Sequence, residues 1–568
     1  MRIDIKKIFR KDIIAVLSVF ILGFPTWRTL LSKGYFTMHD DLQVLRLWEM
    51  EKCFLNGQIP CRWAPDMGAG FGQPLFNFYS AFPYYFGMFF RLFGFQFVDI
   101  VKILFLFSLL LSGIFMYFLA KEFFGRFPAL VASVFYMYAP YRAVDIYVRG
   151  AMAEAWAFVF FPIIFLAIYK FVKEEKMCWF IGIIFSLSAL FLSHNIMTMI
   201  FTPFAILWGI FSLAVLRKWK VFSKLSLSFL WAVGLSSFFL IPAFFEKKFV
   251  RIDTLTSGYF DFHNHFVYKG QLLFSRFWGY GGSHGASSEM SFQIGWPHWW
   301  LVCLALPLIF FLLIRKKFLK EVFCLVFFLF IFFVSVFLTH RTSVFIWEKV
   351  PLMPFIQFPW RFLGLIVFAS SFLSGGVIFV LRKIRFRKIS VFLSLIILVS
   401  AMLLNVQYFK PEQIYPGIDD NFKLSGKELE KQQLAALLDY LPKNVKEIPK
   451  GLAPVSPWVI DGKAIVSEYA KRSNFWRFTV DVTKEARIKV PIVDFPRWEV
   501  VIDQKPVTFS SDNPEGVIEV VVPPGKHTIV GFFRDTPLRS FANSLTVFSF
   551  FSLISLIVIL SREDEETI

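Results

Sequence analysis

Two adjacent carboxylates and an imidazole, His39-Asp40-Asp41, come shortly after the first long apolar segment of the chain. A carboxylate at the mouth of such a segment can accept a proton from a hydroxyl group, and a pair of carboxylates can hold a divalent cation. The same residues are also compatible with an ordinary loop, because an Asp-Asp pair arises by chance in many proteins. The segments that surround them therefore decide which interpretation is favoured.

Other polar residues stand at the predicted outer ends of apolar segments. Glu154 is the most informative, because an acid inside a spanning helix costs about 2.5–3.5 kcal/mol at the bilayer centre and less near an end. It needs a partner or a function, and the simpler alternative is an ion pair with Arg149 or Arg142 at the membrane surface. His194 equally suits a cap or an interfacial side chain. The candidate substrate-binding residues are His39, Arg142, Arg149, Glu154, His194, Trp360 and Arg361.

No metal site is predicted from the histidines. His263 and His265 lie two residues apart with no nearby cysteine or third histidine, so they offer too few ligands for zinc. The glycine-rich stretch 279–285 lacks the Lys-Ser/Thr of a phosphate-binding loop, and we expect a flexible external loop that could cover a substrate. A divalent cation at Asp40 and Asp41 is the one cofactor left open.

The composition identifies an integral membrane protein. The 568 residues are 57% hydrophobic and include 78 Phe, whereas soluble domains are typically about 45–50% apolar. The formal net charge of +19 comes from Lys and Arg that cluster in short links between apolar runs. This pattern is typical of membrane topology, so the basic charge does not indicate nucleic-acid binding.

Twelve apolar segments are candidates for membrane-spanning helices, which need about 20 mostly apolar residues. They cover residues 13–31, 98–120, 127–142, 151–170, 177–194, 196–216, 221–243, 299–314, 321–339, 361–381, 389–405 and 542–560. A further stretch at 80–97 carries Pro83, Arg91 and many aromatic residues, which favours a helix on the membrane surface. If that stretch does not cross, the basic links fall on one side, which places both termini in the cytoplasm and His39-Asp40-Asp41 outside.

These spans predict a transmembrane domain over 1–405 with a long first external loop at 32–97, an external domain at 406–541, and a last span with an acidic cytoplasmic tail at 542–568. Cys53 and Cys61 share the first external loop and could form a disulfide in an oxidising compartment.

The external domain is predicted to begin with a helix and to continue as strands. Apolar and polar residues alternate over 476–482 and 486–490, as half-buried strands require. The stretches 517–522 and 527–533 flank a Pro-Pro-Gly sequence and predict a hairpin. We expect a small β-sandwich-like domain.

Stretches in most parts of the chain carry a resemblance to known proteins. They are His39-Asp40-Asp41, Gly57-Gln58-Ile59-Pro60, Arg62-Trp63, residues 68–72, 74–79, 147–154, 192–195 and 357–361. Together they resemble bacterial multi-pass membrane proteins filed under a 6-pyruvoyl-tetrahydropterin-synthase-related domain. The far end, from Phe495-Pro496-Arg497-Trp498 through Pro524-Gly525-Lys526-His527 to the last span, is similar to the YfhO-like membrane proteins.

Such proteins look like members of the GT-C superfamily of glycosyltransferases. The resemblance implies a mainly α polytopic fold whose first external loop places an acidic residue, Asp40 or Asp41, beside a polyprenyl-phosphate-linked sugar. Pterin chemistry is not expected, because no matching three-histidine site is present.

The residues and the resemblance lead to one predicted function. A sugar on a lipid phosphate has an activated leaving group, so the protein needs to orient the acceptor, take its proton and stabilise the departing phosphate. Asp40 or Asp41 would be the base, and Arg142, Arg149 or Arg361 would hold the phosphate. We expect transfer to an external glycan, lipid or protein acceptor at the bacterial cytoplasmic membrane.

Two other functions are open from the sequence. A lipid or glycan transporter is the first, but transporters often show repeated halves and broken spans with polar residues near the midplane, and no repeat is visible here. A non-catalytic envelope scaffold that keeps the fold without the reaction is the second.

Overall fold

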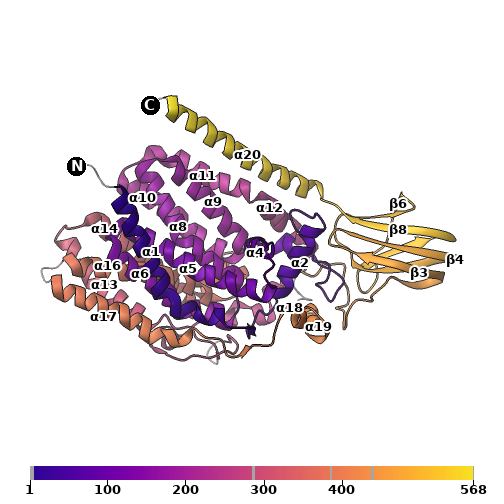
Figure 1. Cartoon of the computed structure of the whole chain (residues 1–568), viewed down its shortest axis with the longest axis horizontal. Coiled ribbons are helices and arrows are strands. Elements are labelled where there is room, and N and C mark those ends of the chain that lie inside the picture. The colour runs from indigo at the N-terminus through magenta and orange to yellow at the C-terminus, as the bar shows by residue number, and fades with distance from the viewer. Residues whose placement is uncertain (1–4, 285–287, 384–386, 436–439, 567–568) are drawn as a thin grey trace. The chain divides into compact units, whose positions relative to one another are not determined.

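The computed structural model describes residues 5–284, 288–383, 387–435 and 440–566, and the side chains of 12–284, 288–383, 391–435 and 440–559. The chain divides into two compact units. Unit 1 comprises residues 1–40, 99–232 and 255–417, and unit 2 comprises 41–98, 233–254 and 418–568. The elements are labelled in Figure 1, where the long strands follow one another in the last part of the chain, coloured orange to yellow.

Unit 1 is a bundle of apolar helices. Most of the helix α5 belongs to it, as does most of α11. Its helices are α1 (Ile5–Trp27), α5 (Phe97–Phe124), α6 (Arg126–Tyr138), α7 (Pro140–Ala143), α8 (Met152–Glu174), α9 (Met177–Ser193), α10 (Asn195–Leu216), α11 (Phe222–Leu235), α13 (Trp296–Ile314), α14 (Leu319–Thr339), α15 (Val344–Lys349), α16 (Leu363–Lys383) and α17 (Arg387–Asn405). Two short strands, β1 (Tyr35–Phe36) and β2 (Ile414–Tyr415), pair antiparallel.

The helix α16 forms the centre of this bundle, since every residue from Leu363 to Val380 is buried. Small residues let neighbouring helices approach it closely. A Cβ atom on Gly376 would collide with Leu325 of α14. On the α8 side, Phe165 lies within 5.0 Å, between ring centroids, of both Trp208 of α10 and Phe368 of α16. Aromatic packing of this kind stabilises the bundle in place of polar contacts.

Nine helices of the described chain are long and apolar enough to cross a membrane, against the twelve predicted. They are Asp12–Leu31, Phe97–Phe124, Met152–Glu174, Asn195–Leu216, Trp296–Ile314, Leu319–Thr339, Pro359–Lys383, Val391–Tyr408 and Pro537–Ile559. The pair Trp219–Leu235 and Ser237–Phe249 makes a tenth if it is counted as one broken span. The protein is therefore a multi-pass membrane protein.

The two remaining predicted spans form shorter helices. The helix α6 has 13 residues and rises only about 20 Å, less than the hydrocarbon core of about 30 Å, because it ends at Tyr138, two residues before Pro140. The helix α9 has 17 residues. Which end of each helix faces the cytoplasm stays a prediction from the basic links.

Unit 2 contains the first loop from Asp41 onward, the segment Val233–Thr254 and the C-terminal part of the chain. Its helices are α2 (Gln43–Leu55), α3 (Leu75–Phe78), α4 (Phe82–Arg91), α12 (Ser237–Phe245), α18 (Asp420–Lys423), α19 (Gly426–Ala435) and α20 (Pro537–Glu566). The only long helix in the stretch 80–97, all of which the structure describes, is α4. With ten residues it is too short to cross a membrane, as predicted. A disulfide joins Cys53 to Cys61, the pairing left open by the sequence.

The strands of unit 2 form one connected antiparallel sheet. They are β3 (Trp458–Lys471), β4 (Phe475–Val493), β5 (Trp498–Ile502), β6 (Lys505–Val507), β7 (Val517–Val522) and β8 (Gly525–Phe533), in the order β3-β4-β8-β5-β6 with β7 also on β4. A bridge between Ser510 and Glu519 brings the chain after β6 to β7, so the sheet curls around its core. Trp63 and Phe78 of the first loop belong to that core together with Trp476 and Trp498.

The predicted hairpin between β7 and β8 is wrong. Both strands pair with β4. The strand β8 pairs with the first half of β4, starting at Phe475↔Phe532, and β7 pairs with the second half, starting at Ala486↔Val522. The chain therefore runs straight on through Pro523-Pro524 and does not reverse. Proline lacks the backbone N–H, so it interrupts the ladder of hydrogen bonds without having to turn the strand.

Candidate functional site

A corner of the chain before α8 positions three of the predicted polar residues, Arg142, Arg149 and Glu154. The helix α6 ends at Tyr138, the short helix α7 follows, and a wide π-type turn covers Val144–Val148. Gly150 then adopts φ +64, and a Cβ atom there would collide with Met38. Only glycine suits a left-handed backbone in such a close contact. The corner places Glu154 in the first turn of α8, where the helix dipole favours a negative charge.

Arg149 is the central cation of this corner. Its Nη1 donates to Asp145 Oδ1 at 2.6 Å and to Glu154 Oε2 at 2.8 Å. The hydroxyl of Tyr141 donates to the other oxygen of Glu154 at 2.5 Å. The guanidinium of Arg149 also lies 4.5 Å from the ring centroid of Trp360. Glu154 therefore pairs with Arg149, which is the simpler alternative that the sequence left open, and Asp145 shares the ion pair.

Arg361 approaches the same group from the turn Pro359–Phe362 that precedes α16. Its Nη1 donates to Ile356 O at 2.7 Å and to Gln357 Oε1 at 2.9 Å, while its Nε lies 3.9 Å from Glu154 Oε2. This contact is too long for a hydrogen bond but close enough for electrostatic attraction.

Arg142 and His194 have other partners. Arg142 is fully buried, and its Nη2 reaches Ser108 O at 3.3 Å and Ser112 Oγ at 3.2 Å. These oxygens carry no formal charge. His194 caps α10, since its Nδ1 accepts from Met197 N at 2.9 Å, which is the capping interpretation that the sequence left open.

Positive charge exceeds negative charge in this group, which we call the Arg149 cluster. The group contains three guanidinium groups and two carboxylates, and both carboxylates, Asp145 and Glu154, are fully buried. Among the described residues, Arg142 Nε, Arg361 Nε and Trp360 Nε1 are buried without a hydrogen-bond partner. Buried donors normally have acceptors. The cluster therefore carries one positive charge more than its carboxylates balance. Its members are Tyr141, Arg142, Asp145, Arg149, Glu154, Trp360 and Arg361.

The backbone of the first loop runs beside this cluster. His39 N donates to Val148 O at 2.9 Å, and Asp40 N donates to Arg149 O at 2.9 Å. The ring of His39 hydrogen-bonds through Nε2 to Tyr280 O at 2.6 Å. Asp40 is half-buried. The structure thus brings His39 and Asp40 to the segment that carries Arg149.

Asp41 has different surroundings, in unit 2. Its Oδ2 lies 2.6 Å from Lys423 Nζ, and Lys423 also binds Glu428 Oε1 at 2.9 Å. Burial raises the pKa of Asp41, and the positive charge of Lys423 opposes that shift. Lys423 was not among the predicted site residues, because 382 residues separate it from Asp41.

Tyr141 was also missed as a partner of Glu154. Tyr141 precedes Arg142 in the short turn between two apolar segments. Its hydroxyl group, at the polar end of an otherwise apolar side chain, is the one feature of the sequence that indicates a polar partner.

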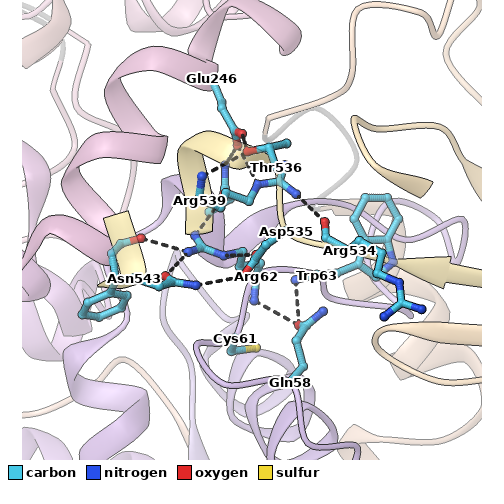
Figure 2. Close-up of polar contacts among 12 residues, drawn as sticks. Gln58, Cys61, Arg62, Trp63, Glu246, Arg534, Asp535, Thr536, Arg539 and Asn543 are labelled. Atoms are coloured by element: carbon cyan, nitrogen blue, oxygen red, sulfur yellow. Dashed lines mark hydrogen bonds and ion pairs between the residues drawn. The ribbon is translucent and has the colours of Figure 1, made fainter. Parts of the chain in front are cut away.

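A second group of charged side chains, all of which except Asp535 are buried, lies in unit 2 (Figure 2). Arg539 Nε donates to Glu246 Oε2 at 2.9 Å, and Thr536 donates to Glu246 Oε1 at 2.8 Å. Arg62 lies 3.3 Å from Asp535 Oδ1 and donates to Asn543 Oδ1 at 2.8 Å. Two arginines thus face two carboxylates. We call this group the Glu246 network, and its members are Arg62, Asn77, Glu246, Asp535, Thr536, Arg539 and Asn543.

Within the described residues, no three His, Cys, Asp or Glu side chains gather as they would around a metal ion. His263 contacts Asp261 at 2.7 Å, whereas His265 contacts Tyr259 O and Ser283 O at 2.6 and 2.8 Å. The two histidines therefore have separate partners.

Comparisons with known proteins give distant matches. No protein-family model matches the chain. A protein of Lactococcus lactis subsp. cremoris (strain MG1363), described as uncharacterized, is 24% identical over 265 residues, which are 44% of this chain and 41% of that protein. The chain thus spans less than half the length of this relative.

Two solved structures of Archaeoglobus fulgidus are also similar. The oligosaccharyltransferase in its apo form has a TM-score of 0.42 and 12% identity over 76% of this chain and 60% of that chain. The oligosaccharyltransferase AglB in complex with an inhibitory peptide and a dolichol-phosphate has a TM-score of 0.40 with the same identity and coverage. These scores are too low to support a conclusion about activity, and the families named from the sequence stay predictions.

Proposed function

We propose that this protein is a membrane glycosyltransferase that moves a sugar from a polyprenyl-phosphate donor to an acceptor outside the cytoplasm. The observation that carries the proposal is the excess positive charge of the Arg149 cluster. Three arginines and two buried carboxylates leave one positive charge unbalanced, and a lipid-linked phosphate is an anion that a membrane enzyme meets within the bilayer.

The donor phosphate would bind to Arg361 and Arg149. A guanidinium offers planar, paired donors that match phosphate oxygens. Arg149 is already held by Asp145 and Glu154, which orients its remaining donors, and the hydroxyl of Tyr141 orients Glu154 in turn. Such prior orientation lowers the cost of stabilising charge that develops on the leaving phosphate.

Asp40 would receive the proton. The oxygen or nitrogen of the acceptor forms a bond to C1 of the sugar, while the bond from C1 to the phosphate oxygen breaks and its electron pair stays on the phosphate. The proton of the acceptor passes to the carboxylate of Asp40. This choice is supported by the hydrogen bond from Asp40 N to Arg149 O, which keeps the carboxylate and the arginine segment together.

The proposed reaction takes place on the external side of the bacterial cytoplasmic membrane. The disulfide between Cys53 and Cys61 supports that side, because disulfides persist in oxidising compartments. It lies in the loop that follows Asp40 and Asp41, and the basic links between spans favour the same orientation.

The test is sugar transfer by the full chain reconstituted in vesicles with radiolabelled polyprenyl-phosphate sugars. We expect Asp40→Asn to lower kcat by about 10²–10⁴-fold, the usual contribution of a general base. Asp512→Asn is the control, because Asp512 is a surface residue of the sheet unit that contacts Lys446. Unchanged transfer by Asp40→Asn would remove the proposed base. Movement of the labelled lipid across the bilayer without a new glycosidic bond would favour a transporter.

A further inference from the structure

Asp40 and Asp41 are neighbours in sequence, yet Asp41 pairs with Lys423, which lies 382 residues later in the chain. Lys423 is almost fully buried, with 3% of its side chain exposed, and its Nζ lies between Asp41 Oδ2 and Glu428 Oε1. A lysine so buried keeps its charge only with close anionic partners. The carboxylate of Asp41 is therefore engaged in a fixed ion pair.

The backbone around Lys423 is itself anchored within unit 2. Asp420, one turn earlier, accepts hydrogen bonds from Phe97 N at 2.8 Å and Val98 N at 2.9 Å, which are the first residues of α5. Gln432 of α19 donates to Lys423 O at 2.6 Å. These contacts fix the position of the ammonium group, so it can fix the position of Asp41 in turn.

We propose that Lys423 assigns different roles to the two adjacent carboxylates: it holds Asp41 as a stationary anion that anchors the loop, and Asp40 is the carboxylate that receives the proton of the acceptor. This inference rests on the proposed function. Lys423 is a positioning residue in it, because it acts through Asp41 and the loop.

The electrostatics of Asp41 agree with an anchoring role. The charged groups that act on it are Lys423 of α18 and Glu428 and Lys431 of α19. Burial raises its pKa, and Lys423 is the largest influence in the opposite direction. One carboxylate oxygen, Oδ1, is buried and has no hydrogen-bond partner among the described residues. A buried oxygen of this kind is poorly placed to meet an incoming acceptor.

The test measures the ionisation of Asp41 separately from catalysis. A lipophilic carbodiimide modifies protonated carboxyl groups, and peptide mass spectrometry follows modification of Asp41 against pH. In Lys423→Met we expect the midpoint of Asp41 modification to rise by about 1–3 pH units, the usual influence of an opposite charge at this distance. Lys423→Arg should return it close to the wild-type value.

The transfer assay then distinguishes anchor from base. If Asp40 is the base, Lys423→Met lowers kcat. The acidic limb of the pH profile of kcat then moves by less than half a pH unit, which is less than the change in the midpoint of Asp41 modification. Asp41→Asn should keep at least tenfold more transfer than Asp40→Asn. A limb that moves together with the Asp41 midpoint would make Asp41 the base and overturn the proposal.

A matched control separates this effect from general damage. Lys489 is also largely buried, with 12% of its side chain exposed, and pairs with Glu515 at 2.8 Å in the sheet of the same unit. Lys489→Met should leave both the midpoint and the limb unchanged. An unchanged Asp41 midpoint in Lys423→Met overturns the role of Lys423. Wild-type protein that transfers no sugar would instead remove the proposed function, while the modification assay still decides whether Lys423 holds Asp41.

Discussion

The two buried charge groups of this protein differ in their balance. In the Glu246 network, Arg62 and Arg539 face two carboxylates. The Arg149 cluster contains three arginines and two carboxylates, and two of the arginines, Arg149 and Arg361, lie near these carboxylates. Both groups contain a buried N–H without a hydrogen-bond partner, including Arg539 Nη2 in the network. The net charge, more than the number of N–H groups without a partner, therefore distinguishes the Glu246 network, which we expect to be structural, from the Arg149 cluster, which we propose binds an anion.

The largest effect expected from this comparison is loss of the carboxylate at the centre of the balanced network. Glu246→Gln leaves Arg539, which is fully buried, without its ion pair. Removing one partner of a buried pair typically costs about 3–5 kcal/mol of unfolding free energy. The measurement is chemical unfolding of the full chain in detergent. A cost below about 1 kcal/mol would mean that the network does not depend on charge balance.

Removal of an arginine from the Arg149 cluster should weaken the binding of an anion and leave the unfolding free energy almost unchanged. Arg361→Gln removes the excess charge, so we expect little change in unfolding free energy but about 10–100-fold weaker binding of a polyprenyl monophosphate, since a charge-assisted hydrogen bond contributes about 1.5–3 kcal/mol. Arg534→Gln is the control, because Arg534 is more than half exposed. Equal binding by Arg361→Gln and wild type would contradict an anion site in the cluster.

The disulfide in the first loop offers a comparison between covalent and electrostatic stabilisation of unit 2. Cys53 and Cys61 are eight residues apart, and closing so short a loop stabilises a fold by about 2 kcal/mol. Replacing both cysteines by serine should lower the unfolding free energy of unit 2 by that amount, less than Glu246→Gln does. A loss larger than that of Glu246→Gln would reverse the order.

An exposed ion pair should give the smallest effect. In the sheet, His527 Nδ1 lies 2.6 Å from Asp503 Oδ2, and this hydrogen bond raises the pKa of His527 and lowers that of Asp503. The histidine contributes stability below about pH 6.5 and loses it as pH rises through its raised pKa, while the aspartate contributes above about pH 4 and loses it as pH falls. Between these limits His527→Gln should cost less than about 1 kcal/mol. The same cost at pH 9 would contradict the pairing.

Sequence patterns predicted the local elements better than their partners. Each of the twelve apolar segments is helical in the described chain, because apolar composition and length decide a helix locally. The span of α6 was overestimated because Pro140 ends the helix early. The strand positions β4, β7 and β8 follow from alternation, but alternation does not specify which strand pairs with which, so the hairpin was wrong.

In the candidate site, too, contacts between residues close in sequence could be predicted, whereas contacts between distant residues could not. Glu154 and Arg149 lie five residues apart, and an acid at the end of an apolar run needs a cation, so their pairing could be predicted. Lys423 could not be paired with Asp41, since it carries no local signal and many lysines stand outside the spans. Long-range pairs of this kind depend on tertiary packing that one sequence does not reveal.

The contact between Asp41 and Lys423 also sets an order in time. At a synthesis rate of about 5–20 residues per second, the 382 residues between them take about 20–80 s to make. Asp420, which caps the first residues of α5, is separated from them by a similar length of chain. The growing polypeptide therefore carries Asp41 without its lysine partner through most of translation, and under the proposed roles it becomes competent for transfer only once nearly three-quarters of the chain has been made.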